Sequence, residues 1–166
     1  MTTRPRALGE RRAAPSSPAP SGGSSRSEHR GDHTQPFSFP VRVYYEDTDA
    51  AGIVYYANYL KFMERARTEW LDRHALPLPE LERAHGVVFV VTRAEIDFKG
   101  AARLGDRLEA TVDFEAAGRA RLTARQTVRR DGEVLVEATI MLACLAREGF
   151  RPARLPDDLA RLLEPR

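Results

Sequence analysis

The sequence predicts an α+β fold in which a curved antiparallel sheet of about five strands wraps around one long central helix. Three observations support this prediction: five segments have the apolar pattern of strands, one long segment has helical spacing of apolar residues, and tight turn signals separate the later strands. Tight turns make neighbouring strands antiparallel, and a sheet with a single apolar face needs a cover. Only the long helical segment can supply that cover, so we expect the sheet to wrap around it.

The first strand and the helix come early in the regular part of the chain. Val41, Val43 and Tyr45 alternate with outward-facing residues and predict a strand. After Gly52 the apolar period becomes helical, and no Gly or Pro interrupts it before Pro77. We therefore predict a helix over about residues 57–73, whose apolar face carries Tyr55, Tyr59, Phe62, Met63, Ala66 and Trp70.

Four more strands follow the helix, and alternating apolar residues place them over residues 87–98, 107–115, 120–128 and 134–144. Gly118 marks one turn between them, and Asp131-Gly132 is a strong signal for a two-residue hairpin. We expect a loop containing His85 before the second strand and a short helix over residues 155–163.

The first 36 residues differ from the rest of the chain. They are rich in Pro, Gly, Ser and Arg and contain almost no large apolar side chains. Such a segment buries too little surface to offset its ordering entropy. We therefore divide the chain into a disordered tail, residues 1–36, and one folded domain, residues 37–166. The tail is either a basic arm for membranes or nucleic acid or an extension without a function.

Composition excludes several classes of protein. The chain has 166 residues, 42% of them hydrophobic, which allows a real core. A net charge of +2 gives no broad field for binding nucleic acid. No apolar run approaches the ~20 residues of a membrane-spanning helix. Cys144 is the single cysteine, so an internal disulfide and a cysteine-based zinc site are excluded. We expect a cytoplasmic protein.

An acidic segment joins the first strand to the helix. Asp47 and Asp49 lie two residues apart just before a helix start, where carboxylates favour the helix dipole. From the residues alone these acids either stabilise the turn or carry chemistry. A calcium loop is excluded because Asn58 stands where a bidentate Glu is required. A phosphate site is excluded because Gly52 is the only glycine and the acids would repel the phosphate.

The segment from Tyr45 to Leu71 reads YEDTDAAGIVYYANYLKFMERARTEWL. It resembles the hotdog-fold acyl-CoA thioesterases, relatives of 4-hydroxybenzoyl-CoA thioesterase, and most of all the subfamily associated with the bacterial Tol–Pal system. The resemblance runs over about residues 37–163 and implies the same fold, a sheet wrapped around a helix. It also implies hydrolysis of short-chain or aromatic acyl-CoA without metal or cofactor, the CoA thioester being the substrate. The implied assembly is a homodimer or homotetramer with active sites between subunits.

The resemblance assigns catalytic roles to two residues. Asp49 matches the catalytic carboxylate of the family, and the backbone N–H of Tyr56 matches the donor that polarises the thioester carbonyl. Many relatives carry His where Tyr56 stands. That departure keeps open the alternative of a non-catalytic scaffold that binds acyl-CoA or acyl carrier protein. A hotdog dehydratase would need a His on the central helix, and residues 55–73 contain none. Asp49 acts as a nucleophile or as a general base; the sequence leaves both routes open.

Four further residues are candidates for binding substrate. Asn58 bonds backbone near the helix start or orients Asp49, and Tyr59 lies in the core or lines the acyl pocket. Lys99 and Arg103 flank the turn at residues 100–102, where they meet the phosphates of CoA or simply belong to an exposed turn. Glu64 is expected to pair locally on the helix rather than act as a base.

Overall fold

The computed structural model describes residues 36–164. The predicted tail lies outside these residues, apart from Pro36, so its disorder stays a prediction. Within the described part of the chain, no helix has the length and apolar character needed to cross a membrane.

The core of the fold is one five-stranded sheet whose neighbouring strands are all antiparallel. The strand order is β1-β3-β4-β5-β2, so β1 and β2 form the two edges. The bounds are Phe37–Arg42 for β1, Val87–Phe98 for β2, Arg107–Ala116 for β3, Arg121–Arg130 for β4 and Glu133–Ala146 for β5. All five predicted strands are therefore confirmed, with small shifts of their ends.

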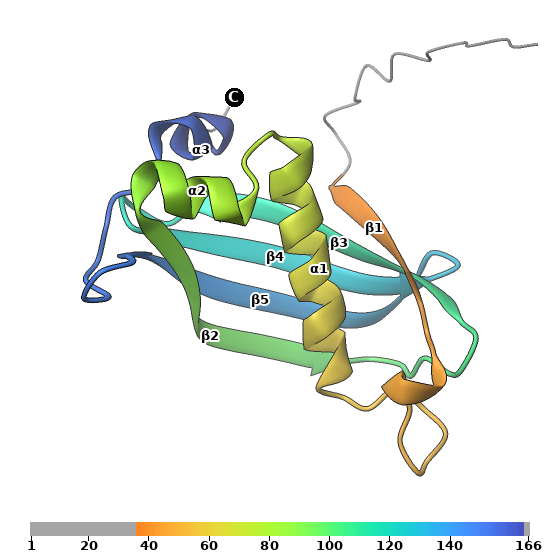
Figure 1. Cartoon of the computed structure of the whole chain (residues 1–166). Helices are drawn as coiled ribbons and strands as arrows, with labels where there is room; N and C mark the ends of the chain where they lie inside the picture. Colours follow the sequence, from red (N-terminus) through yellow and green to blue (C-terminus); the bar gives the residue numbers. More distant parts are fainter. Residues whose placement is uncertain (1–35, 165–166) are drawn as a thin grey trace, which may run out of the picture. The chain divides into compact units, whose positions relative to one another are not determined.

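Helix α1, Asn58–Arg73, lies across one face of the sheet (Figure 1). Its side chains Phe62, Met63 and Ala66 are fully buried against the strands. A large apolar side chain contributes about 1.5–3 kcal/mol when it is buried, so this face of α1 holds the helix in place. The predicted central helix and the sheet wrapped around it are confirmed. Placing Tyr55 on the apolar face of the helix was wrong, because α1 begins three residues later and Tyr55 is 44% exposed.

The register shows which side chains share the inner face with α1. On β5 the buried residues alternate along the strand, at Val136, Ala138, Ile140, Leu142 and Cys144. The residues of β2 opposite them are Phe98, Ile96, Ala94, Val91 and Phe89, which therefore face the same way. Because β2 is an edge strand, this row is only partly covered: Val91 is 52% and Phe98 50% exposed.

Two short helices complete the domain, α2 at Leu78–His85 and α3 at Asp157–Leu162. The prediction of α3 is confirmed, whereas the loop predicted around His85 is wrong because that residue ends α2. The sequence does contain signals for α2. Pro79 lies in its first turn, Leu81 supplies a buried apolar residue, and Gly86 ends the helix in the left-handed region at φ 62°.

The first strand ends earlier than predicted. It ends at Arg42, and the chain then forms a short 3₁₀ helix, η1, at Tyr45–Asp47. Val41 and Val43 are buried as predicted, but Tyr45 is 82% exposed. Placing Tyr45 on the inner face was wrong, because the strand ends three residues earlier, at Arg42, and its alternation no longer applies.

The hairpin between β4 and β5 has the turn that its sequence predicts. Asp131 and Gly132 both have positive φ, 51° and 84°, as a type I′ turn requires. Gly132 has open space around the position of a missing Cβ. Backbone conformation, and not a steric clash, is therefore what favours glycine there.

We expect Gly132→Ala to lower the free energy of unfolding by about 1 kcal/mol, since a Cβ penalises the left-handed conformation. Chemical denaturation measures this change. Gly132→Asn should lower the free energy of unfolding less than Gly132→Ala does, because Asn tolerates positive φ better than Ala. Equal stability of the wild type and the Ala variant would contradict this account of the turn.

Candidate active site

Two loops meet at the N-terminal end of α1. The first runs from η1 to α1 and contains Asp49 and Tyr56, and the second joins β2 to β3 over residues 99–106. Backbone hydrogen bonds fix them together: the N–H of Val54 donates to the carbonyl of Ala102 at 2.8 Å, and Ile53 forms a β-bridge with Arg103. Candidate residues more than 40 positions apart in the sequence are thereby brought to one end of the molecule.

Asp47 stabilises the first loop, one of the two roles that the sequence left open for the acids. Its buried carboxylate accepts a hydrogen bond from the N–H of Tyr44 at 2.8 Å. Its backbone carbonyl accepts two more, from the N–H of Tyr55 at 2.9 Å and from the side-chain amide of Asn58 at 3.0 Å. Asn58 is buried, and its side chain hydrogen-bonds to the backbone, which is the first of the two roles predicted for it. The carbonyl that it contacts belongs to Asp47, ahead of the helix and not within its first turn.

Asp49 occupies the first position of a tight turn that closes at Gly52, whose N–H donates to the carbonyl of Asp49 at 2.9 Å. Gly52 has a φ of 72°, in the left-handed region. The carboxylate of Asp49 accepts a hydrogen bond from the N–H of Ala51 at 2.8 Å and is exposed in the single chain. The loop therefore presents this carboxylate at the surface with a defined direction.

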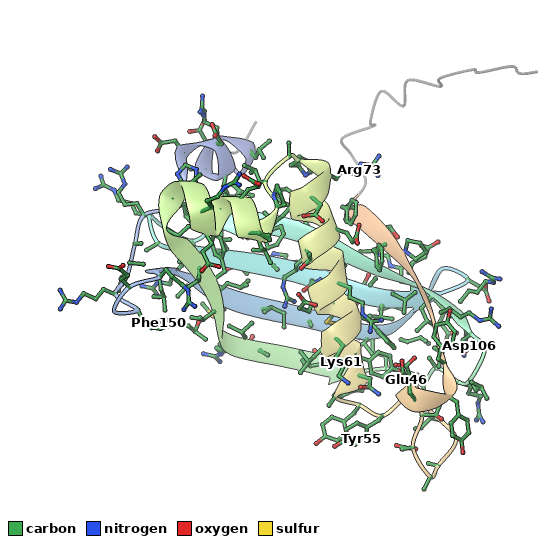
Figure 2. The ribbon with its side chains drawn as sticks, viewed as in Figure 1. Glu46, Tyr55, Lys61, Arg73, Asp106 and Phe150 are labelled. Carbon is green, nitrogen blue, oxygen red and sulfur yellow. The ribbon has the colours of Figure 1, made fainter. Side chains whose placement is uncertain are left out.

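The negative charge of Asp49 acts on the neighbouring Tyr55. The pKa of Tyr55 is raised, first by its hydrogen bond with the side chain of Tyr56 and to a smaller extent by the charge of Asp49. Figure 2 shows Tyr55 beside the first turn of α1, at the end of the helix opposite Arg73. The carboxylate and the tyrosine pair thus share one electrostatic environment.

The backbone N–H of Tyr56 is available to a ligand. Tyr56 precedes Ala57, the N-cap of α1, where the first N–H groups of a helix lack partners within it. Among residues 36–164, no protein acceptor takes a hydrogen bond from the Tyr56 N–H. The positive end of the helix dipole adds to its attraction for a developing negative charge. This N–H has the properties of an oxyanion donor.

An exposed aromatic patch, formed by Tyr55, Tyr56 and Phe98, surrounds this N–H. The three side chains are 44%, 62% and 50% exposed. The rings of Tyr56 and Phe98 pack edge to face with centroids 6.3 Å apart. The patch joins the start of α1 to the end of the edge strand β2.

Tyr59 supports the second loop from inside the core. Its side chain is buried, and its hydroxyl accepts a hydrogen bond from the N–H of Ala102 at 2.9 Å. Burial raises the pKa of Tyr59. Of the two roles predicted for Tyr59, the structure places it in the core, and a contact with the acyl group stays a prediction.

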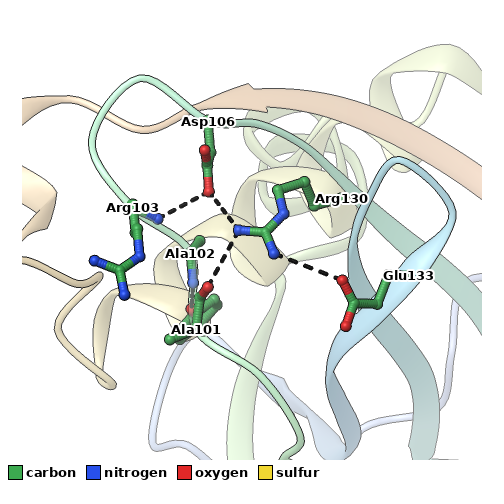
Figure 3. A network of polar contacts seen from close by, with 7 residues as sticks. Ala101, Ala102, Arg103, Asp106, Arg130 and Glu133 are labelled. Atoms are coloured by element: carbon green, nitrogen blue, oxygen red, sulfur yellow. Dashed lines mark hydrogen bonds and ion pairs between the residues drawn. The ribbon is translucent and has the colours of Figure 1, made fainter.

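A polar network holds the other end of this loop (Figure 3). The Asp106 carboxylate accepts hydrogen bonds from the N–H of Arg103 at 2.9 Å and from the guanidinium of Arg130 at 2.8 Å. The same guanidinium donates to the carbonyl of Ala101 at 3.3 Å and contacts Glu133 at 3.5 Å. Sequence reasoning missed Asp106 and Arg130, which lie 24 residues apart and carry no local motif.

The two predicted CoA-binding cations differ in their surroundings. Lys99 contacts Glu137 at 2.6 Å, a half-exposed pair of the kind that contributes little stability. Arg103 is exposed, and within residues 36–164 its guanidinium forms no ion pair.

Glu64 accepts a hydrogen bond from the hydroxyl of Thr68 at 2.9 Å, the local pairing that was predicted. In the described part of the chain, no three His, Cys, Asp or Glu side chains are grouped to hold a metal ion.

Comparison with known proteins gives a consistent result. Residues 43–163 match the model of the thioesterase-like superfamily. The chain is 40% identical to the acyl-CoA thioesterase YbgC of Haemophilus influenzae over 123 residues, 74% of this chain and 90% of that protein. It is 38% identical to the acyl-CoA thioester hydrolase YbgC of Escherichia coli O6:H1, covering 76% and 95% of the two chains.

A solved structure supports the same comparison. The crystal structure of a 1,4-dihydroxy-2-naphthoyl-CoA thioesterase from Synechocystis superimposes with a TM-score of 0.72. It shares 26% sequence identity with this chain, and the superposition covers 78% of this chain and 96% of the other. The likeness therefore extends over most of both chains.

The ion pair beneath the second loop predicts a dependence on pH. The pKa of Asp106 is lowered, chiefly by the hydrogen bond from Arg130. A carboxyl with a lowered folded-state pKa stabilises the protein above its ordinary pKa of about 3.9, and this contribution is lost as the pH falls through the folded value. We expect Asp106→Asn to melt below the wild type at pH 7 and the difference to shrink below about pH 4. Thermal denaturation across this range measures it, and a difference that grows on acidification would contradict the assignment.

Proposed function

The chain belongs to the thioesterase-like superfamily and is a hotdog-fold thioester hydrolase, and from this premise we propose how it acts. It hydrolyses the thioester of short-chain or aromatic acyl-CoA to the free acid and CoA. Asp49 and the backbone N–H of Tyr56 are the catalytic groups. The observation that carries the proposal is the unpaired Tyr56 N–H at a helix start, in the same fixed loop as the exposed Asp49 carboxylate.

The substrate class rests on the relatives. The YbgC proteins are named for acyl-CoA thioesters in general, and the Synechocystis enzyme for an aromatic one. The aromatic patch beside the Tyr56 N–H is suited to pack against a flat or apolar acyl group. Acyl carrier protein, as a second source of thioester, stays a prediction, as do a cytoplasmic location and an association with the Tol–Pal system.

In the first catalytic step, the thioester carbonyl oxygen accepts a hydrogen bond from the Tyr56 N–H. Negative charge develops on this oxygen as the carbonyl carbon becomes tetrahedral. A fixed donor at the positive end of α1 stabilises that charge without reorganising, because the helix already orients it. The bond between the carbonyl carbon and sulfur then breaks, and CoA leaves as the thiolate.

Asp49 supplies the attacking group by one of two routes. As a nucleophile, its carboxylate oxygen adds to the carbonyl carbon, CoA thiolate leaves, and water hydrolyses the resulting mixed anhydride to the acid and Asp49. As a general base, it takes a proton from water while the water oxygen adds to the same carbon. An aspartate with the ordinary pKa of about 4 is a weak base at neutral pH, so the second route needs a drier site.

A second copy of the chain supplies that drier site. Asp49, Tyr55 and Tyr56 are exposed in the single chain, and β2 beside them is an unpaired edge strand with apolar residues on its inner face. An edge strand presents a row of N–H and C=O groups that can pair with a strand of another chain. We propose a homodimer or homotetramer in which a neighbouring subunit covers this end.

The loops carry candidates for the CoA end of the substrate. Arg103 presents an exposed cation next to Ile53, on the loop that adjoins the catalytic one, and is the better placed of the two for phosphate. Lys99 forms an ion pair with Glu137 and would have to leave that carboxylate to bind a phosphate of CoA. Asn58 and Tyr59 contribute by holding the two loops in place.

Replacing the catalytic carboxylate tests the function. We expect Asp49→Ala and Asp49→Asn to lower kcat by at least about 100-fold on a panel of short-chain and aromatic acyl-CoA substrates, because both lose the base or nucleophile. The matched control is Glu46→Gln, which neutralises an exposed acid three residues away and should retain activity. Wild-type turnover as low as that of Asp49→Ala, with intact acyl-CoA binding, would instead select the non-catalytic scaffold.

Removing the backbone donor tests the other catalytic group. Tyr56→Pro lacks the N–H, and we expect kcat to fall by about 100- to 1000-fold, as for other oxyanion donors. Ala57→Pro is the control, because Ala57 has a φ of −70°, which proline adopts. This substitution removes the N–H of residue 57 and leaves the Tyr56 N–H in place. Circular dichroism confirms that both variants fold. Equal loss in both would argue against a specific role of the Tyr56 N–H.

A further inference from the structure

A cavity of about 180 Å³ lies between α1 and the sheet, away from the catalytic loop. Its walls are mostly aromatic and aliphatic side chains from all three α-helices and four strands, among them Leu71, Phe89 and Leu142. An engineered apolar cavity of about 150 Å³ holds benzene, so this space suits an aryl or alkyl group. It opens at its rim, where Leu78 and Val91 are exposed.

Three polar side chains of α1 interrupt this apolar lining: Glu64, Arg67 and Thr68. Glu64 and Thr68 are hydrogen-bonded to each other, so Arg67 is the group that can bind a ligand. Arg67 lies on α1, is 9% exposed and lines the cavity. Its guanidinium donates to the side-chain oxygen of Gln126 at 2.8 Å. Gln126 is itself fixed, because its amide donates to the carbonyls of Met63 at 3.0 Å and Thr111 at 3.1 Å. The guanidinium is therefore held in one orientation.

Most donors of Arg67 remain free. Arginine carries five N–H groups, and Gln126 is the one acceptor bonded to them among residues 36–164. No carboxylate in that range forms an ion pair with Arg67. Yet no fully buried side-chain nitrogen of the described residues lacks a partner. The remaining guanidinium nitrogens of Arg67 therefore reach open space, and the space that it lines is the cavity.

The surroundings make this cation a strong donor. Burial lowers the pKa of Arg67, and the charge of Glu64 opposes that change in part. Glu64 is exposed and bonded to Thr68, so solvent screens its charge. A hydrogen bond from a desolvated guanidinium to a carboxylate is charge-assisted and takes a two-pronged geometry.

An apolar strip connects the catalytic loop with this cavity. Phe98 contacts Tyr56 at one end, and Ile96, Ala94 and Val91 continue along the inner face of β2 to the cavity rim. Tyr56 lies two residues before α1, and the nine positions from Asn58 to Arg67 correspond to about 14 Å of helix rise. The side chain of Arg67 leans back toward the helix start and shortens this gap.

We propose that the cavity receives the far end of the acyl group and that Arg67 selects acyl chains ending in a hydrogen-bond acceptor, above all a carboxylate. This inference rests on the proposed function, with the thioester at the Tyr56 N–H and the chain lying along the strip. Arg67 is then a specificity-determining residue. The substrates are ω-carboxyacyl-CoA thioesters long enough to reach the cavity.

Matched substrates of equal carbon number test the proposal: adipyl- against hexanoyl-CoA, suberyl- against octanoyl-CoA, and sebacyl- against decanoyl-CoA. We expect the wild type to favour the carboxylate member in kcat/KM at one chain length or more. Arg67→Met should lower that ratio by about 10- to 100-fold, the value of a hydrogen bond to a charged group. Arg65→Met removes an exposed arginine from the same helix and should leave the ratio unchanged.

Equilibrium binding of the same pairs separates this inference from the proposed function. Dissociation constants are measured for Asp49→Ala with and without Arg67→Met or Arg67→Lys, so turnover is not needed. Tighter binding of the carboxylate member that depends on Arg67 supports the inference even if hydrolysis fails. Tighter binding of the methyl-ended member at every length, or a ratio that Arg67→Met leaves unchanged, overturns it while the hydrolase proposal stands.

Discussion

The burial of α1 in the curve of the sheet is the constraint on which the rest of the structure depends. Phe62, Met63 and Ala66 have no exposed surface, so the helix cannot rotate without opening the core. This packing fixes the direction of the helix start and with it the Tyr56 N–H. It also fixes Tyr59, whose ring is in the core and whose hydroxyl holds the Ala102 N–H of the second loop. Core and site therefore share one helix.

The same packing leaves part of the sheet uncovered. One helix is too narrow to cover five strands, so the inner face of the edge strand β2 stays partly exposed beside the loop that contains Asp49 and Tyr56. The row from Phe98 to Val91 leads from the aromatic patch to the cavity with Arg67 on its wall. An open strip of this kind is costly in a single chain but useful to an enzyme for apolar acyl groups, because substrate and a second subunit can cover it.

The candidate site could be predicted in part from the sequence. Asp47, Asp49, Tyr56 and Asn58 lie within twelve residues of each other, in one long local motif that the sequence alone reveals. Only the fold shows which backbone group Asn58 contacts: its side-chain amide donates a hydrogen bond to the carbonyl of Asp47. The partner of Lys99, Glu137, was not foreseeable because it lies on a distant strand. Tyr45 illustrates an error of another kind. The alternating strand pattern continues in the sequence as far as Tyr45, but this residue begins the short 3₁₀ helix η1.

The sequence by itself determined the five strands, the central helix and the turn at Asp131-Gly132, because period, chain length between turns and the need for positive φ are local properties. It did not determine the contacts that support the site. Tyr59 with Ala102, Asp106 with Arg130 and Arg67 with Gln126 join residues 43, 24 and 59 positions apart. Such pairs depend on strand register and on the depth of α1 in the sheet. Only the tertiary structure decides these, because each is set by the packing of the whole core.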